Sequence, residues 1–395
     1  MRITQWTIPL VLAAAMLPAS DAHAIPAWAR KYNMNCSGCH APAVPRLNAK
    51  GFAFKWAGYR LPEEIGENQE VKQLSEYLAA RVKIEYAVAK TQSQTADVNA
   101  FSLGDATIFA GGPFGKNFGA MLEFAHSADG VELVNSVYGV WGNAEQHFGA
   151  RVGQMHWLLE GSVAGFDRAT GISAVTPLDM PLTSGGVPFA FGEHQVGVEA
   201  FWVKGKNRLS VEVLNGLSAA GMGNGAGDPG HKDFAVIDQF LWDDNGSGVT
   251  AVAYFGSISG LDTLVGVTTS RFNRFAVSAN KFFGKAEVMG GFITGEDSDL
   301  PVGTVFGAKS VKGSGFWGYA GYTLPSTLTV FGRYDNVNSN SDVPNSGNDR
   351  VTLGGVLPVN LPEYLRFAAE YTLDLPRATG AQKRHGLTLQ LMMNF

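Results

Sequence analysis

Two cysteines and a histidine form the one motif of this sequence with a specific chemistry. The pentapeptide Cys36-Ser37-Gly38-Cys39-His40 contains both cysteines of the 395-residue chain. Cys-x-x-Cys-His is the attachment signature of haem c, in which two thiols reach the two vinyl groups of one porphyrin and the adjacent imidazole ligates the iron. A redox dithiol would sit beside a βαβ pattern, and a zinc site would need a second Cys/His cluster. The sequence has neither, so we predict one covalently attached haem c on Cys36, Cys39 and His40.

The N-terminus indicates the compartment. Arg2 is followed by an apolar stretch from Ile8 to Leu17 and by Ala22-His23-Ala24, a small-x-small cleavage site. This order is typical of a cleaved secretory signal peptide over residues 1–24, and the apolar stretch is too short to span a membrane. Haem c is attached outside the cytoplasm, so the signal peptide and the haem motif predict the same export.

The composition is not that of a soluble cytochrome. Hydrophobic residues make up 45% of the chain, charged residues 16%, and glycine accounts for 49 positions, yet the mean hydropathy is only +0.01. After the signal peptide no stretch approaches the about 20 continuous apolar residues of a spanning helix. Hydrophobicity spread in this way is expected of a transmembrane β-barrel. The net charge of −5 gives no reason to expect nucleic-acid binding.

Alternating polarity supports the barrel prediction. From His385 to Phe395 the odd-numbered residues are mostly apolar and the even-numbered ones mostly small or polar, which predicts a strand with one apolar face. The same pattern occurs from Leu365 to Leu373 and from Arg81 to Val88, where Arg81, Lys83 and Glu85 share the polar face. Charged side chains on that face suit a wet lumen. We therefore predict an all-β fold, a transmembrane antiparallel barrel of about sixteen strands.

The predicted loops alternate in length, as they do in bacterial barrels with both termini in the periplasm. We expect long external loops at 158–192, 216–247, 295–313 and 337–348. Short periplasmic turns are expected at 204–206, 259–260 and 324–325. Acidic residues in two of the external loops are candidates for gathering divalent cations such as Fe(II): Asp228, Asp233, Asp238, Asp243, Asp244, Glu296, Asp297 and Asp299. Tryptophans near strand ends fit an aromatic girdle: Trp141, Trp157, Trp202, Trp242 and Trp317.

The chain divides into the signal peptide (1–24), a monohaem cytochrome c-like module (25–79) and the barrel (80–395). About 55 residues make a small core, so we expect the module to pack into the barrel as a plug. Its Met34 lies too close to Cys36 to reach the opposite haem face. The distal iron ligand is then either absent or supplied by the barrel wall, where Met121, Met155 and His147 are candidates on lumen-facing positions.

Together these features resemble the fused monohaem cytochrome–porins of the outer membrane, best known from iron oxidisers. The residues that carry the resemblance are Ile25 to Arg30, Cys36 to His40, Pro45, Leu47, Asn48, Gly51 and Phe54. The resemblance implies an outer-membrane protein that takes electrons from extracellular Fe(II), or another redox donor, through its single haem. It also implies a periplasmic electron-carrier cytochrome as the acceptor. Electron flow in the outward direction and a solute porin with a haem-bearing plug stay open as alternatives.

Overall fold

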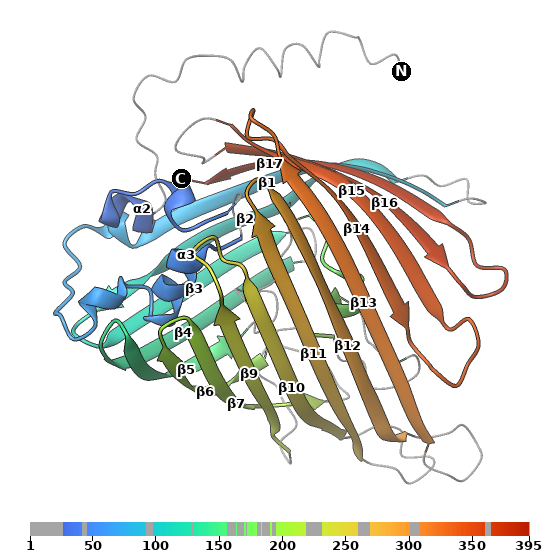
Figure 1. Cartoon of the computed structure of the whole chain (residues 1–395), viewed down its shortest axis with the longest axis horizontal. Helices are drawn as coiled ribbons and strands as arrows, with labels where there is room; N and C mark the ends of the chain where they lie inside the picture. The colour runs from blue at the N-terminus through green and yellow to red at the C-terminus, as the bar shows by residue number, and fades with distance from the viewer. Residues whose placement is uncertain are drawn as a thin grey trace.

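The computed structural model describes residues 27–41, 46–91, 98–127, 130–155, 163, 170, 172–179, 183, 190–191, 195–218, 231–259, 269–300, 309–359 and 365–394. The predicted signal peptide lies outside these residues. Figure 1 shows a small set of helices at one end of a large barrel. No helix in the described ranges is long and apolar enough to cross a membrane.

Short helices precede the sheet, and one more helix interrupts it. They are α2 (Ala27–Tyr32), η1 (Cys36–Gly38), α3 (Ala49–Trp56), η2 (Pro62–Glu64), η3 (Leu74–Glu76) and α4 (Thr176–Asp179). The strands are β1 (Leu78–Thr91), β2 (Val98–Phe114), β3 (Phe118–Ser127), β4 (Gly130–Gly142), β5 (Gln146–Met155), β6 (Gln195–Lys204), β7 (Asn207–Leu214), β8 (Leu217–Ser218), β9 (Asp233–Leu241), β10 (Gly248–Ser259), β11 (Thr269–Phe283), β12 (Ala286–Leu300), β13 (Lys309–Thr323), β14 (Thr329–Asn338), β15 (Gly347–Val359), β16 (Leu365–Pro376) and β17 (Arg384–Asn394).

Sixteen of the seventeen strands in the described part of the chain form a closed antiparallel ring. Neighbours follow the chain order from β1 to β7 and from β9 to β17, and β1 pairs with both β2 and β17. The two-residue β8 lies parallel to β10 outside this order. Closure leaves no open sheet edge, which is what a β-structure needs in a membrane. The prediction of a transmembrane barrel of about sixteen strands is confirmed.

The two faces of the wall have opposite polarity, as the alternation predicted. Leu387 and Leu389 of β17 point outward and are exposed. The next residue, Gln390, points inward and is buried. On β16, Arg366 and Glu370 are buried on the inner face. Many inward charges are paired: Arg151 lies 2.8 Å from Glu199 of the next strand. An apolar exterior and a charged, paired interior are the arrangement expected of a wall that faces lipid.

Short and long connections gather at opposite ends of the barrel. At the short-turn end the strands are joined through residues 115–117, 143–145, 205–206, 242–247, 284–285, 324–328 and 360–364. The other end, which we call the long-loop end, has the connections 156–194, 215–232, 260–268, 301–308, 339–346 and 377–383, together with the shorter 92–97 and 128–129. The alternation is thus confirmed for most of the chain.

Two loop predictions were wrong. The range 216–247 is not one external loop, because it contains β9 and the turn 242–247. Ser259 ends β10 at the long-loop end and is not part of a short turn. Strand β9 was missed because its inward residues Ala235, Ile237 and Leu241 are as apolar as its outward ones. They pack in buried hydrophobic clusters inside the barrel, so the polar–apolar alternation disappears.

The acidic residues expected in external loops lie elsewhere. Asp233 and Asp238 belong to β9, and Glu296, Asp297 and Asp299 belong to β12. Asp243 and Asp244 lie in a turn at the short-turn end, where they pair with Lys281 and Lys206. Asp228 is outside the described residues. Among the residues described, no group of three or more His, Cys, Asp or Glu side chains is arranged to hold a metal ion.

The aromatic girdle is confirmed in part. Trp141, Trp202 and Trp242 are exposed near the short-turn end of β4, β6 and β9. Trp317 was wrongly assigned: it points inward from β13 and is buried in the main hydrophobic cluster. Trp157 lies outside the described residues.

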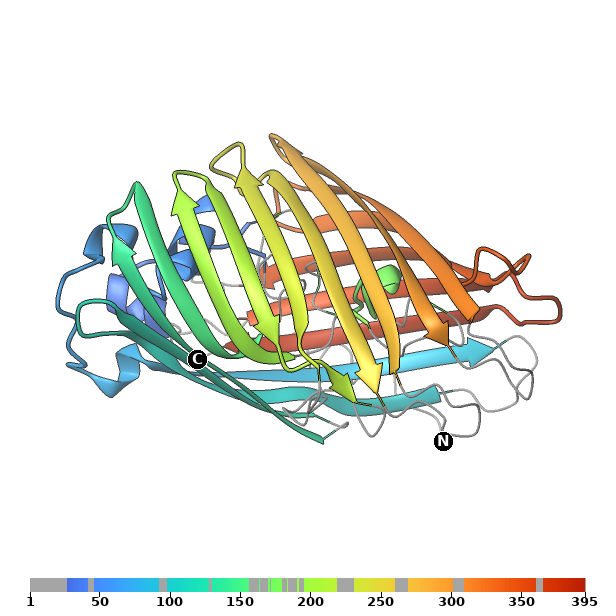
Figure 2. The ribbon, with the colours of Figure 1, turned by 90° about the horizontal axis from the view of Figure 1, so that it is seen from below.

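The long connection after β5 enters the barrel. Its short helix α4 contacts β13 and β14 and is seen inside the outline of the barrel in Figure 2. Leu178 of α4 is fully buried, and the hydroxyl of Thr176 donates to Asp335 of β14 over 3.1 Å. The described part of this connection therefore narrows the lumen.

Candidate functional site

The N-terminal module packs against the inner wall at the short-turn end. Phe52 and Trp56 of α3, with Tyr59, join one buried cluster with Tyr138 of β4 and Phe201 of β6. Arg60 is fully buried, and its guanidinium donates to the backbone carbonyls of residues 116 and 118 at the β2–β3 turn. Burial lowers the pKa of Arg60. Apolar packing and backbone hydrogen bonds thus fix the module in the mouth of the barrel (Figure 2).

The module and the wall approach so closely that two glycines meet. A Cβ atom on Gly119 of β3 would lie 2.0 Å from the carbonyl oxygen of Gly58. We therefore expect Gly119→Ala to push the module off the wall at a cost of about 1–3 kcal/mol, the range for overpacking. Faster cleavage of the module by a soluble protease would show this. The matched control is Gly318→Ala, because nothing lies within 4 Å of the added methyl group; equal cleavage rates for the two variants would contradict the expectation.

The Cys-x-x-Cys-His turn is held by the start of α3. Asn48 caps the helix by accepting the Gly51 amide over 3.0 Å, and its amide group donates to the carbonyls of Ser37 and Gly38. A Cβ atom on Gly51 would lie 2.3 Å from the Cys39 carbonyl oxygen, so the helix can approach the turn only because this residue is glycine. The Asn48 cap and the close approach of Gly51 therefore hold the Cys-x-x-Cys-His turn against the start of α3.

A hydrogen bond sets the orientation of the His40 ring. Its Nδ1 lies 2.9 Å from the Arg46 carbonyl oxygen. A carbonyl only accepts, so Nδ1 carries the hydrogen and the lone pair is on Nε2. Fixing the tautomer through the second ring nitrogen is how metal-binding histidines are usually oriented.

Arg46 connects this histidine to the far side of the barrel. Its guanidinium forms a buried, two-pronged ion pair with Glu287 of β12, which also accepts from Asn280 over 2.9 Å. One residue therefore orients His40 through its carbonyl and anchors the segment to the wall through its side chain.

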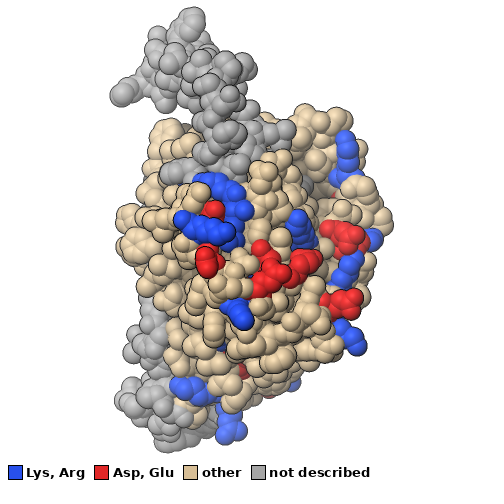
Figure 3. All heavy atoms as spheres, turned by 90° about the vertical axis from the view of Figure 1, so that its left-hand side faces the viewer, with Lys and Arg blue, Asp and Glu red and all other residues tan. Residues whose placement is uncertain are grey.

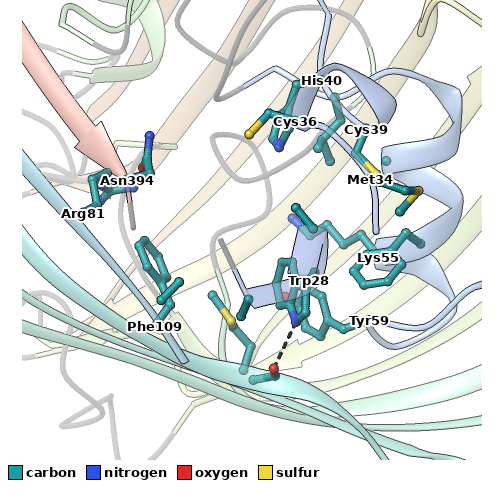
Figure 4. A pocket seen from close by; sticks show the side chains of 18 of the residues that line it. Trp28, Met34, Cys36, Cys39, His40, Lys55, Tyr59, Arg81, Phe109 and Asn394 are labelled. Carbon is teal, nitrogen blue, oxygen red and sulfur yellow. Dashed lines mark hydrogen bonds between the residues drawn. The ribbon is translucent and has the colours of Figure 1, made fainter. Parts of the chain in front are cut away.

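Cys36, Cys39 and His40 line one cavity of about 300 Å³ between the module and the barrel wall. Figure 4 shows them on one side, with Arg81, Phe109 and Asn394 on the opposite side. The opposite side belongs to β1, β2 and β17, so the cavity includes the place where the barrel closes. The volume is at the lower end of the range for small-molecule sites, about 300–1,000 Å³.

The lining of the cavity is mostly apolar. Trp28, Leu47 and Phe54 contribute to it from the module, and the indole of Trp28 donates to the Gly111 carbonyl of β2 over 2.9 Å. The charged side chains that line the cavity, Lys55 and Arg81, are both cationic. Arg81 also contacts Asp105 at 3.0 Å.

Cys36 and Cys39 are both free thiols in the structure. No disulfide joins Cys36 and Cys39. Burial raises the pKa of the Cys39 thiol, with Lys50 acting in the opposite direction. Redox-active dithiols have lowered thiol pKa values.

The structure separates the three candidates for the opposite iron ligand. Met121 of β3 lines the cavity that contains Cys36, Cys39 and His40. His147 is buried at the start of β5, with Nδ1 3.2 Å from the Asn143 carbonyl oxygen, and does not line the cavity. The side chain of Met155 lies outside the described residues. Met34, which the sequence analysis excluded as a ligand because it lies so close to Cys36, also lines the cavity.

Several residues of this site were not predicted from the sequence. Arg46, Lys55, Phe109 and Asn394 carried no motif signal. Arg81 was predicted to face the lumen, which is confirmed, but its place beside the cavity depends on closure of the barrel.

No family model matches the chain, and no curated protein matches it in sequence. Solved structures do match in fold. An anion-selective porin from Comamonas acidovorans has a TM-score of 0.57 at 12% identity, covering 80% of this chain and 98% of that one. The outer-membrane channel DcaP of Acinetobacter baumannii has a TM-score of 0.57 at 11% identity, with 81% and 96% covered. Salmonella typhi OmpF has a TM-score of 0.58 at 10% identity, with 80% and 97% covered. The chain therefore has the β-barrel fold of outer-membrane porins.

Proposed function

We propose that the cavity at the short-turn end holds one haem c and that the protein transfers single electrons across the outer membrane. The observation that carries this proposal is that Cys36, Cys39 and His40 line one cavity while His40 Nδ1 is held by a carbonyl. The Cys36 and Cys39 thiols would form thioethers with the vinyl groups, and His40 Nε2 would ligate the iron. When bound, the haem supplies iron that takes up and releases one electron.

The chain's own residues fit such a group. The amide nitrogen of Asn394 is buried in the cavity wall without a hydrogen-bond partner among the described residues. Together with the ammonium group of Lys55, it offers polar contacts that suit the propionate carboxylates of a haem. The Arg81 guanidinium in the same wall is held by Asp105 and Glu123. Trp28 and Phe54 give the cavity an apolar lining, which would shield a bound haem from water. Met121, which also lines the cavity, would be the candidate for a second protein ligand to the iron.

The proposed direction of flow is inward. The apolar exterior and the porin-like fold support a location in the bacterial outer membrane, reached through a cleaved signal peptide. In bacterial barrels the short turns face the periplasm, which would place the cavity beside a periplasmic electron-carrier cytochrome. Figure 3 shows that the short-turn end carries both basic and acidic side chains. The donor would be extracellular Fe(II), oxidised to Fe(III) as its electron moves inward; outward flow to an external acceptor is the reverse alternative.

A second function, a solute porin, is favoured by a separate observation. The barrels that this chain resembles include an anion-selective porin and an outer-membrane channel. The inner face of the wall carries charged side chains, as porin walls do, and they form pairs such as Arg151–Glu199 and Arg274–Asp297. In this case the module would serve as a plug or a stabiliser.

Conductance and haem reduction, measured on one preparation, distinguish the two functions. The full-length haem protein in a planar bilayer is expected to show little ion conductance, and its haem is expected to be reduced by an external donor. Steady porin-like conductance that is unchanged when the haem is missing would favour the solute porin and overturn the electron conduit.

A further inference from the structure

A second cavity lies at the long-loop end, far from the haem site along the strands. It measures about 450 Å³ and is lined by residues of β10 and β11 and by residues at and just before the start of β9. These three strands are neighbours in the barrel (Figure 1). The residues that matter in it are His231, Lys232, Phe234, Phe255 and Arg271. We call it the basic groove.

The basic groove opens on the outer surface of the wall. Phe234 and Phe255 are register partners on β9 and β10 and are 51% and 47% exposed. Their chain neighbours Asp233 and Tyr254 point inward and are fully buried. Lys232 directly precedes β9, is exposed, and lines the same groove as Phe234. The groove therefore faces the lipid rather than the lumen.

The position of its cations along the wall is specific. Lys232 lies two residues beyond Phe234 toward the long loops, and Arg271 pairs with Ser257, two residues beyond Phe255. Two residues of strand correspond to about 7 Å. Aromatic side chains of barrels gather at the membrane interface. We infer that Phe234 and Phe255 mark this interface at the long-loop end, which places both cations at the level of the lipid headgroups.

The charged side chains described in the groove are both cationic. Lys232 and Arg271 are exposed. Among the described residues no carboxylate lines the groove, and neither Lys232 nor Arg271 forms an ion pair with a described carboxylate. Lys312 on the same rim differs, because it lies 3.8 Å from Glu296. A guanidinium beside an ammonium is an arrangement that binds phosphate.

We propose that the basic groove binds the phosphate-bearing headgroup of a lipid in the leaflet at the long-loop end. Lys232 and Arg271 contact the phosphate, and Phe234 and Phe255 pack against the first part of the acyl chains. The aromatic pair is the reason to choose a lipid over free phosphate, since an inorganic ion gains nothing from it. This site is independent of the haem.

Native mass spectrometry of the full-length protein in detergent tests the proposal, with a diphosphorylated lipid A and its phosphate-free derivative as probes. The wild type is expected to retain only the phosphorylated lipid. The variant Lys232→Gln with Arg271→Gln is expected to bind it at least about tenfold more weakly, because it loses the charged hydrogen bonds to the phosphate. Lys204→Gln is the control, because Lys204 is exposed at the short-turn end of β6; it is expected to bind like the wild type.

Three outcomes would overturn the proposal. In the first, the wild type retains the phosphorylated and the phosphate-free lipid equally. In the second, the double variant binds the phosphorylated lipid like the wild type, while circular dichroism shows that both proteins are folded. Alternatively, inorganic phosphate at millimolar concentration displaces the lipid completely, which indicates a site for the free anion.

Discussion

Replacing Cys36 and Cys39 with serine is expected to leave the barrel folded but to remove all covalently bound haem. The two thiols line the cavity, and they are the only cysteines of the chain. No other side chain of the protein can form the thioether bonds. The barrel depends on strand pairing and on the apolar exterior, neither of which involves the cysteines. This is the largest effect that we expect from any substitution in the protein.

Denaturing electrophoresis with haem staining and the mass of the intact chain measure this result. Ser37→Ala in the same turn is the control, since that side chain does not line the cavity, and it should keep its haem. His40→Ala is expected to keep covalent haem but to change its absorption spectrum and midpoint potential. Covalent haem on the double serine variant would contradict the assigned attachment site.

Breaking the buried pair between Arg46 and Glu287 is expected to have the second largest effect. The side chains of the two residues are only 7% and 4% exposed. Glu287→Leu leaves a guanidinium buried without its carboxylate, which costs about 3–5 kcal/mol in comparable pairs. Because the Arg46 carbonyl orients His40, we expect both looser docking of the module and a shifted haem potential.

A double variant shows whether the expected loss comes from the unpaired charge of Arg46. Arg46→Met combined with Glu287→Leu removes both charges, and such replacements are often neutral or stabilising. The double variant should therefore resist a soluble protease better than Glu287→Leu alone. Lys312→Gln is the control for an exposed pair, for which about 0–1 kcal/mol is expected. The expectation fails if Glu287→Leu is cleaved no faster than this control and keeps its potential.

Residue patterns predicted the parts of the fold that depend on a single strand or turn. The outward Leu387 and Leu389, and the inward Arg366 and Glu370, follow from period-2 alternation because lipid and lumen impose opposite polarity on the two faces. Where a second layer of protein fills the lumen, as behind β9, that rule no longer applies. The missed strand and the inward Trp317 both come from this inner packing.

The candidate site could be predicted only on its module side. Cys36, Cys39 and His40 are adjacent in sequence, so spacing alone identifies them. Asn394 and Phe109 reach the same cavity because β17 and β2 both pair with β1 when the ring closes. The contact of Arg46 with Glu287 joins residues 241 positions apart, and no local pattern encodes it.

Stopped-flow haem absorbance, with anaerobic mixing of the purified full-length protein and ferrous iron, tests the central proposal most directly. The proposal predicts that the bands of ferrous haem appear rapidly with Fe(II) as the donor. They should be absent in the Cys36→Ser, Cys39→Ser variant. A haem that dithionite reduces but Fe(II) does not would contradict inward electron transfer from iron.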